Sequence, residues 1–248
     1  MLTEQRKQIL LQRLKRDGSI VAKELSAELD LSEDTIRRDL RELAAAGLLQ
    51  RVHGGALPAS PTVANLDARR LMAVDEKQRL GKAAAELLEP GQTVFIDGGT
   101  TNLALLGHLP LALKATIVTH SPLIAAALEP HVGIEVILIG GSLLHRSMVS
   151  VGAVALEAIS RLHVDLCFIG LTGLHPRHGA TTGNYEEAAI KHAIVGRSHD
   201  VVSLVTTEKL GAVSPHVICD VAAITTIIIS TDAPAAGLEV SGLRLIRA

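Results

Sequence analysis

The sequence predicts an α/β protein with two parts, an N-terminal winged helix-turn-helix and a C-terminal Rossmann-like parallel sheet. Three observations lead to this fold class. An arginine-bearing amphipathic segment spans residues 31–43. Two short extended runs flank a Gly-Gly turn just after it, which is the pattern of a β-hairpin. From residue 93 onward, short apolar runs alternate with helical stretches, which is typical of a parallel sheet covered on both faces.

Composition limits the possible classes of protein. The 248 residues are 48% hydrophobic but only 1% aromatic, so the core must be aliphatic. A net charge of -2 argues against a uniformly basic coat, although a local basic face is still compatible with it. Cys167 and Cys219 lie inside apolar runs and are expected to be buried thiols of a reducing compartment. The chain shows no secretory segment and no apolar run of about 18 residues, so we expect a cytoplasmic protein that has no membrane partner.

The segment 31–43 is predicted to be a DNA-reading helix. Ile36, Leu40 and Leu43 form one apolar stripe, and three arginines cluster on the opposite face. Ser32 is a suitable N-cap, and Gly47 a suitable stop. Guanidinium groups match phosphates and guanine edges, although a solvated surface helix would show the same pattern. The expected DNA contacts, including two from the following hairpin, are Ser32, Thr35, Arg37, Arg38, Arg41, Arg51 and His53.

The flanking segments supply the rest of a winged helix-turn-helix. Helices are predicted over residues 4–16 and 21–29, with a short extended piece at residues 19–21 between them. The runs 48–52 and 56–57 around the Gly-Gly turn form the predicted hairpin, or wing. The run from Thr35 to Leu40, followed by Gly47-Leu48 and by residues 51–56, resembles the N-terminal signature of the DeoR-type family of bacterial transcriptional repressors.

Domain boundaries follow from a Pro/Ser/Ala stretch at residues 58–62, which continues neither element. We expect a DNA-binding domain over residues 1–57, a linker over 58–74 and an α/β domain over 75–248. In the resembling family, the linker joins the head to a sensor body. Arg69 and Arg70 lie in this linker, where they could be solvated or could contact the other domain.

The body is predicted to alternate strands with helices. An amphipathic helix is expected over residues 75–89, ended by Pro90-Gly91. Ligands of open parallel sheets bind at the carboxyl ends of the strands. The predicted strands are 93–96, 115–119, 135–139, 165–169, 201–206, 225–230 and 243–246, and the predicted helices are 101–106, 123–128, 153–162, 185–197 and 233–240.

Glycines and hydroxyl side chains follow the predicted strands. Asp97-Gly98-Gly99-Thr100-Thr101 offers backbone N–H groups and hydroxyls to an anion, although a tight strand-helix turn would look the same. Thr119 ends the second strand and His120 follows it, while Gly140 and Gly141 follow the third. Together these ends favour a small phosphate-bearing ligand.

Three charged residues complete the predicted ligand site. Lys209 directly follows a buried strand and is expected to contact the ligand. Lys191 stands four residues after Glu187, so the two could form an ion pair on one helix instead. The histidines His175 and His178 have no further metal ligand beside them, and no cofactor or metal is expected.

The body also resembles the sensor domain of the DeoR-type family at these same positions and at Asp165, Phe168, Gly170, Gly173 and Leu210-Gly211. The resemblance implies a fold similar to ribose-phosphate isomerases and a phosphorylated sugar or related metabolite as effector. The family often has Asn where His120 stands and an Asp-Ser-Ser-Lys run where residues 206–209 stand. These departures point to a different effector.

The expected function is a repressor of a carbohydrate catabolism operon, binding double-stranded operator DNA as a homo-oligomer, either a dimer or a tetramer. The alternative is an isomerase-like enzyme with a DNA-binding head. Isomerisation needs positioned acids and bases, and residues 169–173 contain no acid. We therefore predict a sensor without catalytic residues.

Overall fold

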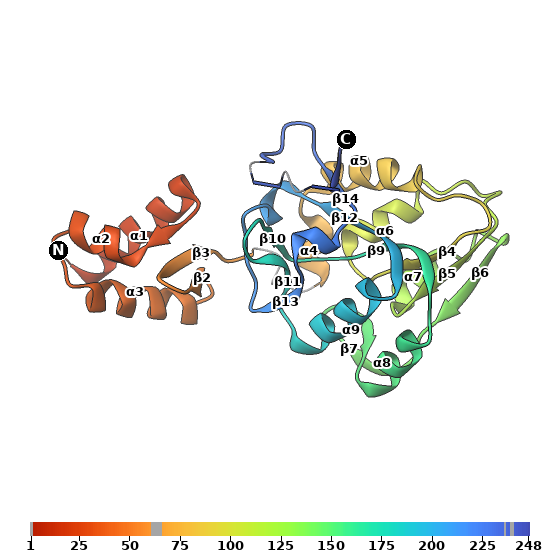
Figure 1. Cartoon of the computed structure of the whole chain (residues 1–248), viewed down its shortest axis with the longest axis horizontal. Coiled ribbons are helices and arrows are strands. Elements are labelled where there is room, and N and C mark those ends of the chain that lie inside the picture. Colours follow the sequence, from red (N-terminus) through yellow and green to blue (C-terminus); the bar gives the residue numbers. More distant parts are fainter. Residues whose placement is uncertain (1, 61–65, 236, 239–240) are drawn as a thin grey trace.

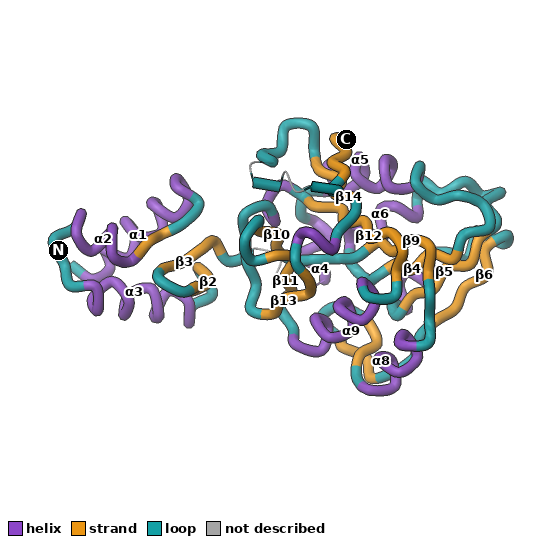
Figure 2. Tube along the Cα trace, viewed as in Figure 1, coloured by secondary structure: helices purple, strands orange, loops and turns teal. Residues whose placement is uncertain are grey.

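The computed structural model describes residues 2–60, 66–235, 237–238 and 241–248. Figure 1 shows a small N-terminal head joined to a larger body by a single stretch of the chain. Coloured by secondary structure, the head is mostly helical and the body mixes both element types (Figure 2). Among the described residues, none of the helices has both the length and the apolar character that crossing a membrane requires.

The head has the predicted winged helix-turn-helix. Its helices pack around one small aliphatic core that includes Leu10, Ile36 and Leu40. The predicted extended piece at residues 19–21 becomes a strand of the wing, giving an antiparallel sheet of order β1-β3-β2. The elements are α1 (Thr3–Asp17), β1 (Ile20–Val21), α2 (Ala22–Glu28), α3 (Glu33–Ala45), β2 (Leu49–Val52) and β3 (Gly55–Pro58).

Two features of the head were not predicted. Asp39 of α3 is buried and forms an ion pair with the buried Arg6 of α1. In the sequence Arg6 is one of several residues of the predicted helix 4–16, and no neighbouring residue indicates that its partner lies in α3. Gly55 lies against β1, where an added Cβ would stand 1.7 Å from the carbonyl oxygen of Ile20. Only glycine therefore permits the close pairing of β1 with β3.

The body is built on seven parallel strands, as predicted. The sheet has the order β15-β14-β12-β9-β4-β5-β6, and every neighbouring pair is parallel. The strands are β4 (Thr93–Ile96), β5 (Ala115–Thr119), β6 (Ile134–Leu138), β9 (Val164–Phe168), β12 (Ser198–Val205), β14 (Thr226–Ile229) and β15 (Arg244–Arg247). Each predicted strand is present, and the largest shift is the start of β12, which is three residues earlier than expected.

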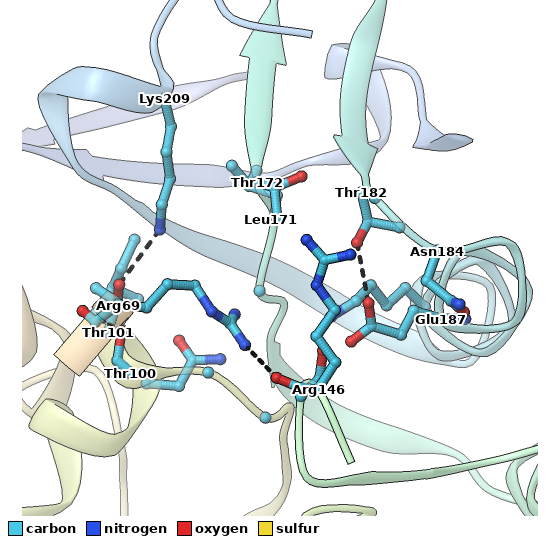
Figure 3. A pocket seen from close by; sticks show the side chains of 18 of the residues that line it. Arg69, Thr100, Thr101, Arg146, Leu171, Thr172, Thr182, Asn184, Glu187 and Lys209 are labelled. Carbon is cyan, nitrogen blue, oxygen red and sulfur yellow. Dashed lines mark hydrogen bonds between the residues drawn. The ribbon is translucent and has the colours of Figure 1, made fainter. Parts of the chain in front are cut away.

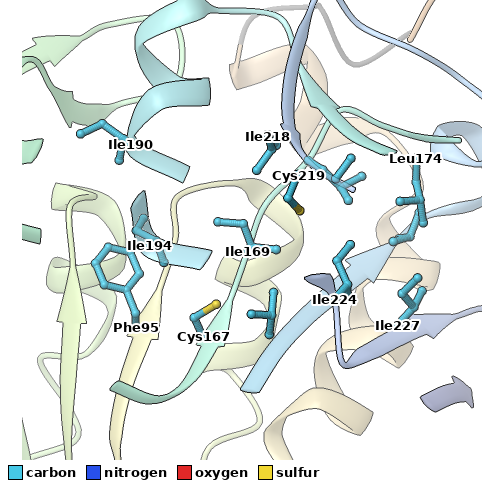
Figure 4. Close-up of a cluster of buried hydrophobic side chains, with 14 of the residues drawn as sticks. Phe95, Cys167, Ile169, Leu174, Ile190, Ile194, Ile218, Cys219, Ile224 and Ile227 are labelled. Atoms are coloured by element: carbon cyan, nitrogen blue, oxygen red, sulfur yellow. The ribbon is translucent and has the colours of Figure 1, made fainter. Parts of the chain in front are cut away.

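Helices cover both faces of this sheet. Along β4, Val94 and Ile96 point into one apolar cluster, whereas Phe95 points into the other. Figure 4 shows part of the second cluster, with Phe95, Ile190 and Ile194 among its members. α5 (Val74–Ala85), α6 (Thr100–Leu106) and α7 (Pro122–Ala127) contribute to the first cluster, and α8 (Ala153–Ser160) and α9 (Tyr185–Val195) to the second.

Other small elements were missed or wrongly assigned. Two small sheets were not predicted. One is the hairpin of β7 (Ser142–Leu144) and β8 (Val149–Val151). The other consists of β10 (Gly173–His175), β11 (Gly179–Thr182) and β13 (His216–Cys219). The predicted helix over 233–240 is wrong for its described residues, which form turns around Pro234 and Gly237, while residues 236, 239 and 240 lie outside the described residues.

Candidate functional site

The predicted DNA face lies on α3 as expected. Arg37, Arg38 and Arg41 are all exposed, opposite the buried Ile36 and Leu40. Ser32 caps the helix, because its Oγ accepts from the backbone N–H of Thr35 at 3.2 Å. The Ser32 and Thr35 hydroxyls lie 2.8 Å apart at the start of the helix.

The three arginines differ in their partners. Arg37 forms an ion pair with Glu33 one turn earlier, at 2.6 Å. Within the described part of the chain, no ion pair engages Arg38 or Arg41. Arg37 also lines a small hollow with Arg51 and His53, between α3 and the wing. The predicted wing contacts therefore lie beside the predicted helix contacts.

A cavity opens at the carboxyl ends of β4, β9 and β12, where the sequence places the ligand. The space between its walls is about 830 Å³, a figure that includes open solvent at its mouth. Its lining contains seven of the predicted ligand contacts, namely Gly98, Gly99, Thr100, Thr101, Glu187, Lys191 and Lys209. These seven residues therefore meet at one cavity, as the strand ends predicted.

Lys209 is a buried ammonium that faces this cavity. Its Nζ donates to the Oγ1 of Thr101 at 3.3 Å, an interaction drawn in Figure 3. Burial, together with the neighbouring cations Lys77 and Arg69, lowers the pKa of Lys209 to about 8 against the opposing effect of Glu208. Among the residues that the structure describes, no carboxylate forms an ion pair with it. An anion in the cavity would relieve this uncompensated charge.

Asp97 lies behind the cavity wall instead of lining it. Its fully buried carboxylate accepts from the backbone N–H of Gly170 at 2.6 Å and from His120 Nε2 at 2.7 Å. It also accepts from Lys191 Nζ. Burial alone would raise the pKa of Asp97, but Lys191 and His120 together lower it to about 2. The carboxylate thus fixes the loop and the lysine that the ligand would meet.

This network corrects the expected pairing of Lys191. The described residues show no ion pair between Lys191 and Glu187, and Lys191 reaches Asp97 on the neighbouring strand end instead. Glu187 accepts from the Thr182 hydroxyl at 3.3 Å, and its backbone N–H is capped by Asn184. Its carboxylate therefore remains on the cavity wall.

Four other predicted contacts are not brought to the cavity wall, as far as the structure describes it. The Thr119 hydroxyl donates to the carbonyl of Ile96, and both ring nitrogens of the buried His120 face protein oxygens. Gly140 is exposed at the end of β6. Gly141 packs against β8, where an added Cβ would stand 2.7 Å from the carbonyl oxygen of Val151. These positions hold the local fold and do not touch the cavity.

Three basic residues of the cavity were missed as ligand contacts. Lys77 of α5 donates to the carbonyls of Arg69 and Met72. Arg69 comes from α4 (Leu66–Leu71) in the predicted linker. Of its two predicted alternatives, a solvated side chain or a contact with the body, the structure shows the contact. Arg146 comes from the β7–β8 turn. Figure 3 shows Arg69 and Arg146 between Lys209 on one side and Glu187 with Thr182 on the other.

Nothing in the described residues indicates a metal centre. His175 and His178 stack with ring centroids 4.7 Å apart, but no group of three metal-ligating side chains gathers in the part of the chain described. The carboxylates near the strand ends are similarly engaged, since Asp97 has three partners and Glu187 bonds Thr182.

Comparison with known proteins identifies the class. Residues 6–62 match the family model of the DeoR-like helix-turn-helix domain, and residues 72–231 match that of the DeoR C terminal sensor domain. The chain belongs to the DeoR family. It is a DNA-binding transcriptional regulator and not an enzyme, and its partner is double-stranded operator DNA.

Relatives and a solved structure extend the match over most of the chain. A putative aga operon transcriptional repressor from Escherichia coli O157:H7 is 30% identical over 98% of this chain and 91% of its own length. The glycerol-3-phosphate regulon repressor of Escherichia coli K12 is 33% identical over 85% of this chain and 84% of its own. A ribose 5-phosphate isomerase A from Methanocaldococcus jannaschii aligns over 55% of this chain and 54% of its own, with 16% identity and a TM-score of 0.41.

Proposed function

We propose that the chain is a repressor of a carbohydrate catabolism operon and that its effector is a phosphorylated sugar or a related phosphorylated metabolite. The observation that carries this proposal is the charge of the cavity. Arg69, Arg146 and Lys209 line it without an ion-pair partner among the described residues, against the single carboxylate of Glu187. The excess of at least two positive charges suits one phosphate dianion.

The two sides of the cavity suit the two ends of such a ligand. Lys209, Thr100 and Thr101 supply a cation and hydroxyl donors on one side, next to the backbone of Gly98 and Gly99. These groups suit the phosphate. Thr182, Asn184 and Glu187 line the other side. A carboxylate that accepts hydrogen bonds suits the hydroxyls of a sugar or polyol.

Occupancy of the cavity is proposed to change DNA binding. The effector must favour one arrangement of the heads by about 1–3 kcal/mol to switch an operator. A single small head buries too little surface for specific operator affinity, so we propose a dimer or tetramer on repeated half-sites. The site of action is proposed to be the cytoplasm. One relative is named the glycerol-3-phosphate regulon repressor, which agrees with a phosphorylated metabolite as effector.

A thermal-shift screen tests the effector class. The purified protein is heated with pairs of compounds that differ only by the phosphate, such as ribose and ribose 5-phosphate or glycerol and glycerol 3-phosphate. We expect at least one phosphorylated member to raise the melting temperature while its partner does not, because binding to the folded state alone stabilises it.

The matched variant for this screen is Lys209→Met, which removes the buried charge and retains the length of the side chain. The shift should disappear in this variant. Equal shifts from both members of every pair, or an unchanged shift in Lys209→Met, would contradict the proposal.

A further inference from the structure

The segment that joins head and body meets the effector cavity in two ways, since one of its described flanks is bonded to a residue of the cavity wall and the other lines the cavity. One flank is residues 58–60, which follow the last strand of the wing, and the other is α4 with Met72. Residues 61–65 between them lie outside the described residues. The two flanks are called the connector below. Their contacts differ in kind.

The first flank is held to the body beside the cavity. The carbonyl of Pro58 accepts from the backbone N–H of Val213 at 3.2 Å, and Ala59 forms a parallel β-bridge with the same residue. The buried Ser60 donates from its Oγ to the carbonyl of Thr172. Thr172 itself lines the cavity. The chain leaving the wing is thus bonded to a residue of the cavity wall.

The second flank places an arginine inside the cavity. Arg69 Nη2 donates to the backbone carbonyl of Arg146 at 3.1 Å, as drawn in Figure 3. Its own carbonyl accepts from the Nζ of Lys77. Its Nε is buried and has no hydrogen-bond partner among the residues that the structure describes. Burial, followed by the repulsion of Arg146, lowers the pKa of Arg69 against the attraction of Glu187.

A buried N–H donor without an acceptor is costly, and a guanidinium is suited to phosphate oxygens. We propose that Arg69 binds the effector phosphate and that the connector carries the occupancy of the cavity to the head. The proposal rests on the proposed function. A phosphate oxygen supplies the missing acceptor and fixes α4, while the same ligand orders Thr172 and so strengthens the bonds of Ser60 and Val213.

Inorganic phosphate serves as the probe, because it is the group that all candidate effectors share. Its affinity is measured by calorimetry on the full chain. The exchange rate of the Val213 amide is measured by NMR on protein labelled with ¹⁵N-valine, because this amide bonds the first flank and lies apart from the proposed phosphate contacts. In the wild-type protein, saturating phosphate should slow this exchange at least fivefold.

The test variant is Arg69→Gln, and its matched control is Arg70→Gln. Arg70 is the next residue of α4, but it is exposed, pairs with Asp67 and does not line the cavity. Arg69→Gln should weaken phosphate binding at least tenfold and remove the slowing at Val213. Arg70→Gln should behave as the wild type. Arg69→Lys, which retains the charge but loses the forked donors, should bind phosphate several-fold more weakly than the wild type.

The outcomes separate this proposal from the function it rests on. Wild-type binding of phosphate with unchanged Val213 exchange would overturn the connector as the transmitting element. Equal phosphate affinity in Arg69→Gln and the wild type would overturn Arg69 as a ligand contact. Absence of phosphate and sugar-phosphate binding in the wild type would overturn the proposed function, and this proposal with it.

Discussion

Lys209 and Asp97 show how burial acts on single charges in this body. Both are buried at the strand ends, yet the pKa of Asp97 falls because Lys191 and His120 surround it, whereas that of Lys209 falls because burial disfavours its charge more than Glu208 stabilises it. A charge with partners is structural, and a charge without partners is available to a ligand. Lys191, which lines the cavity and belongs to the predicted ligand set, therefore has its charge already paired with Asp97.

The pH dependence of Lys209 gives a prediction at this scale. Its folded pKa of about 8 lies below the ordinary 10.5, so between these values the unfolded chain binds more protons and stability rises with pH. Phosphate affinity should change in the opposite direction, falling as the pH rises through 8, because the ammonium loses its charge. Calorimetry with a phosphate monoester such as glycerol 3-phosphate at pH 7 and pH 9 measures this, because the second pKa of a monoester is about 6 and the ligand is mainly a dianion at both values.

Lys209→Arg is the control for this measurement, since a guanidinium stays charged at both pH values. Its phosphate affinity should vary much less than that of the wild type. The same loss of affinity in both proteins would assign the pH dependence to another group.

At the scale of elements, the sequence determined the strands of the main sheet far better than the small sheets. A buried parallel strand is a continuous apolar run, and β4 and β5 were predicted at their observed bounds. The hairpin β7–β8 and the strand β11 are short and rich in serine, threonine and glycine. β11 pairs with the distant strand β13, whereas β7 and β8 pair with each other but are only three residues long each, too short to show a clear apolar alternation.

The same distinction separates the predicted from the missed site residues. The loop Gly98–Thr101 follows a strand directly, so its place was predictable from the chain alone. Arg69 lies in a linker and Arg146 in an unpredicted hairpin, and only the folded chain brings them to one cavity. Thr119, His120, Gly140 and Gly141 also follow strands, but their side chains or backbones turn toward neighbouring strands and loops.

The partners of the α3 arginines give a prediction for this helix. Arg38 is exposed, and no ion pair engages it within the described residues. Arg38→Ala should therefore weaken binding to promoter DNA and, where Arg38 contacts a phosphate, reduce the slope of log affinity against log salt by about one. Fluorescence anisotropy at several salt concentrations measures both.

Arg16→Ala is the control, because Arg16 is an exposed arginine of α1 that pairs with its neighbour Asp17 and belongs to neither α3 nor the wing. Its DNA affinity should match the wild type, and both variants should melt as the wild type does. DNA affinity unchanged in Arg38→Ala would remove this residue from the interface.

At the scale of the whole molecule, the net charge of -2 limits how the protein holds DNA. Affinity depends on a few placed arginines in each head and cannot come from the surface as a whole. Two or more heads acting together would multiply these few contacts.

We therefore expect light scattering to give a solution mass of at least twice the 26.1 kDa of one chain. Binding of promoter DNA should then require two half-sites. A monomer that binds a single half-site with full affinity would contradict the proposed assembly.

The pairing of β1 with β3 has a consequence for the direction of any movement. The strand between α1 and α2 is part of the wing, and the backbone of Ala22 also bonds Gly54, so helices and wing share one sheet and one core. The head is consequently one packed unit, and we expect it to move relative to the body at residues 58–60, where the last strand of the wing meets the body. Metabolite binding would then alter the distance between the heads of an oligomer without altering how each head contacts its bases. The oligomer with and without metabolite would therefore prefer operators with different spacing between their half-sites.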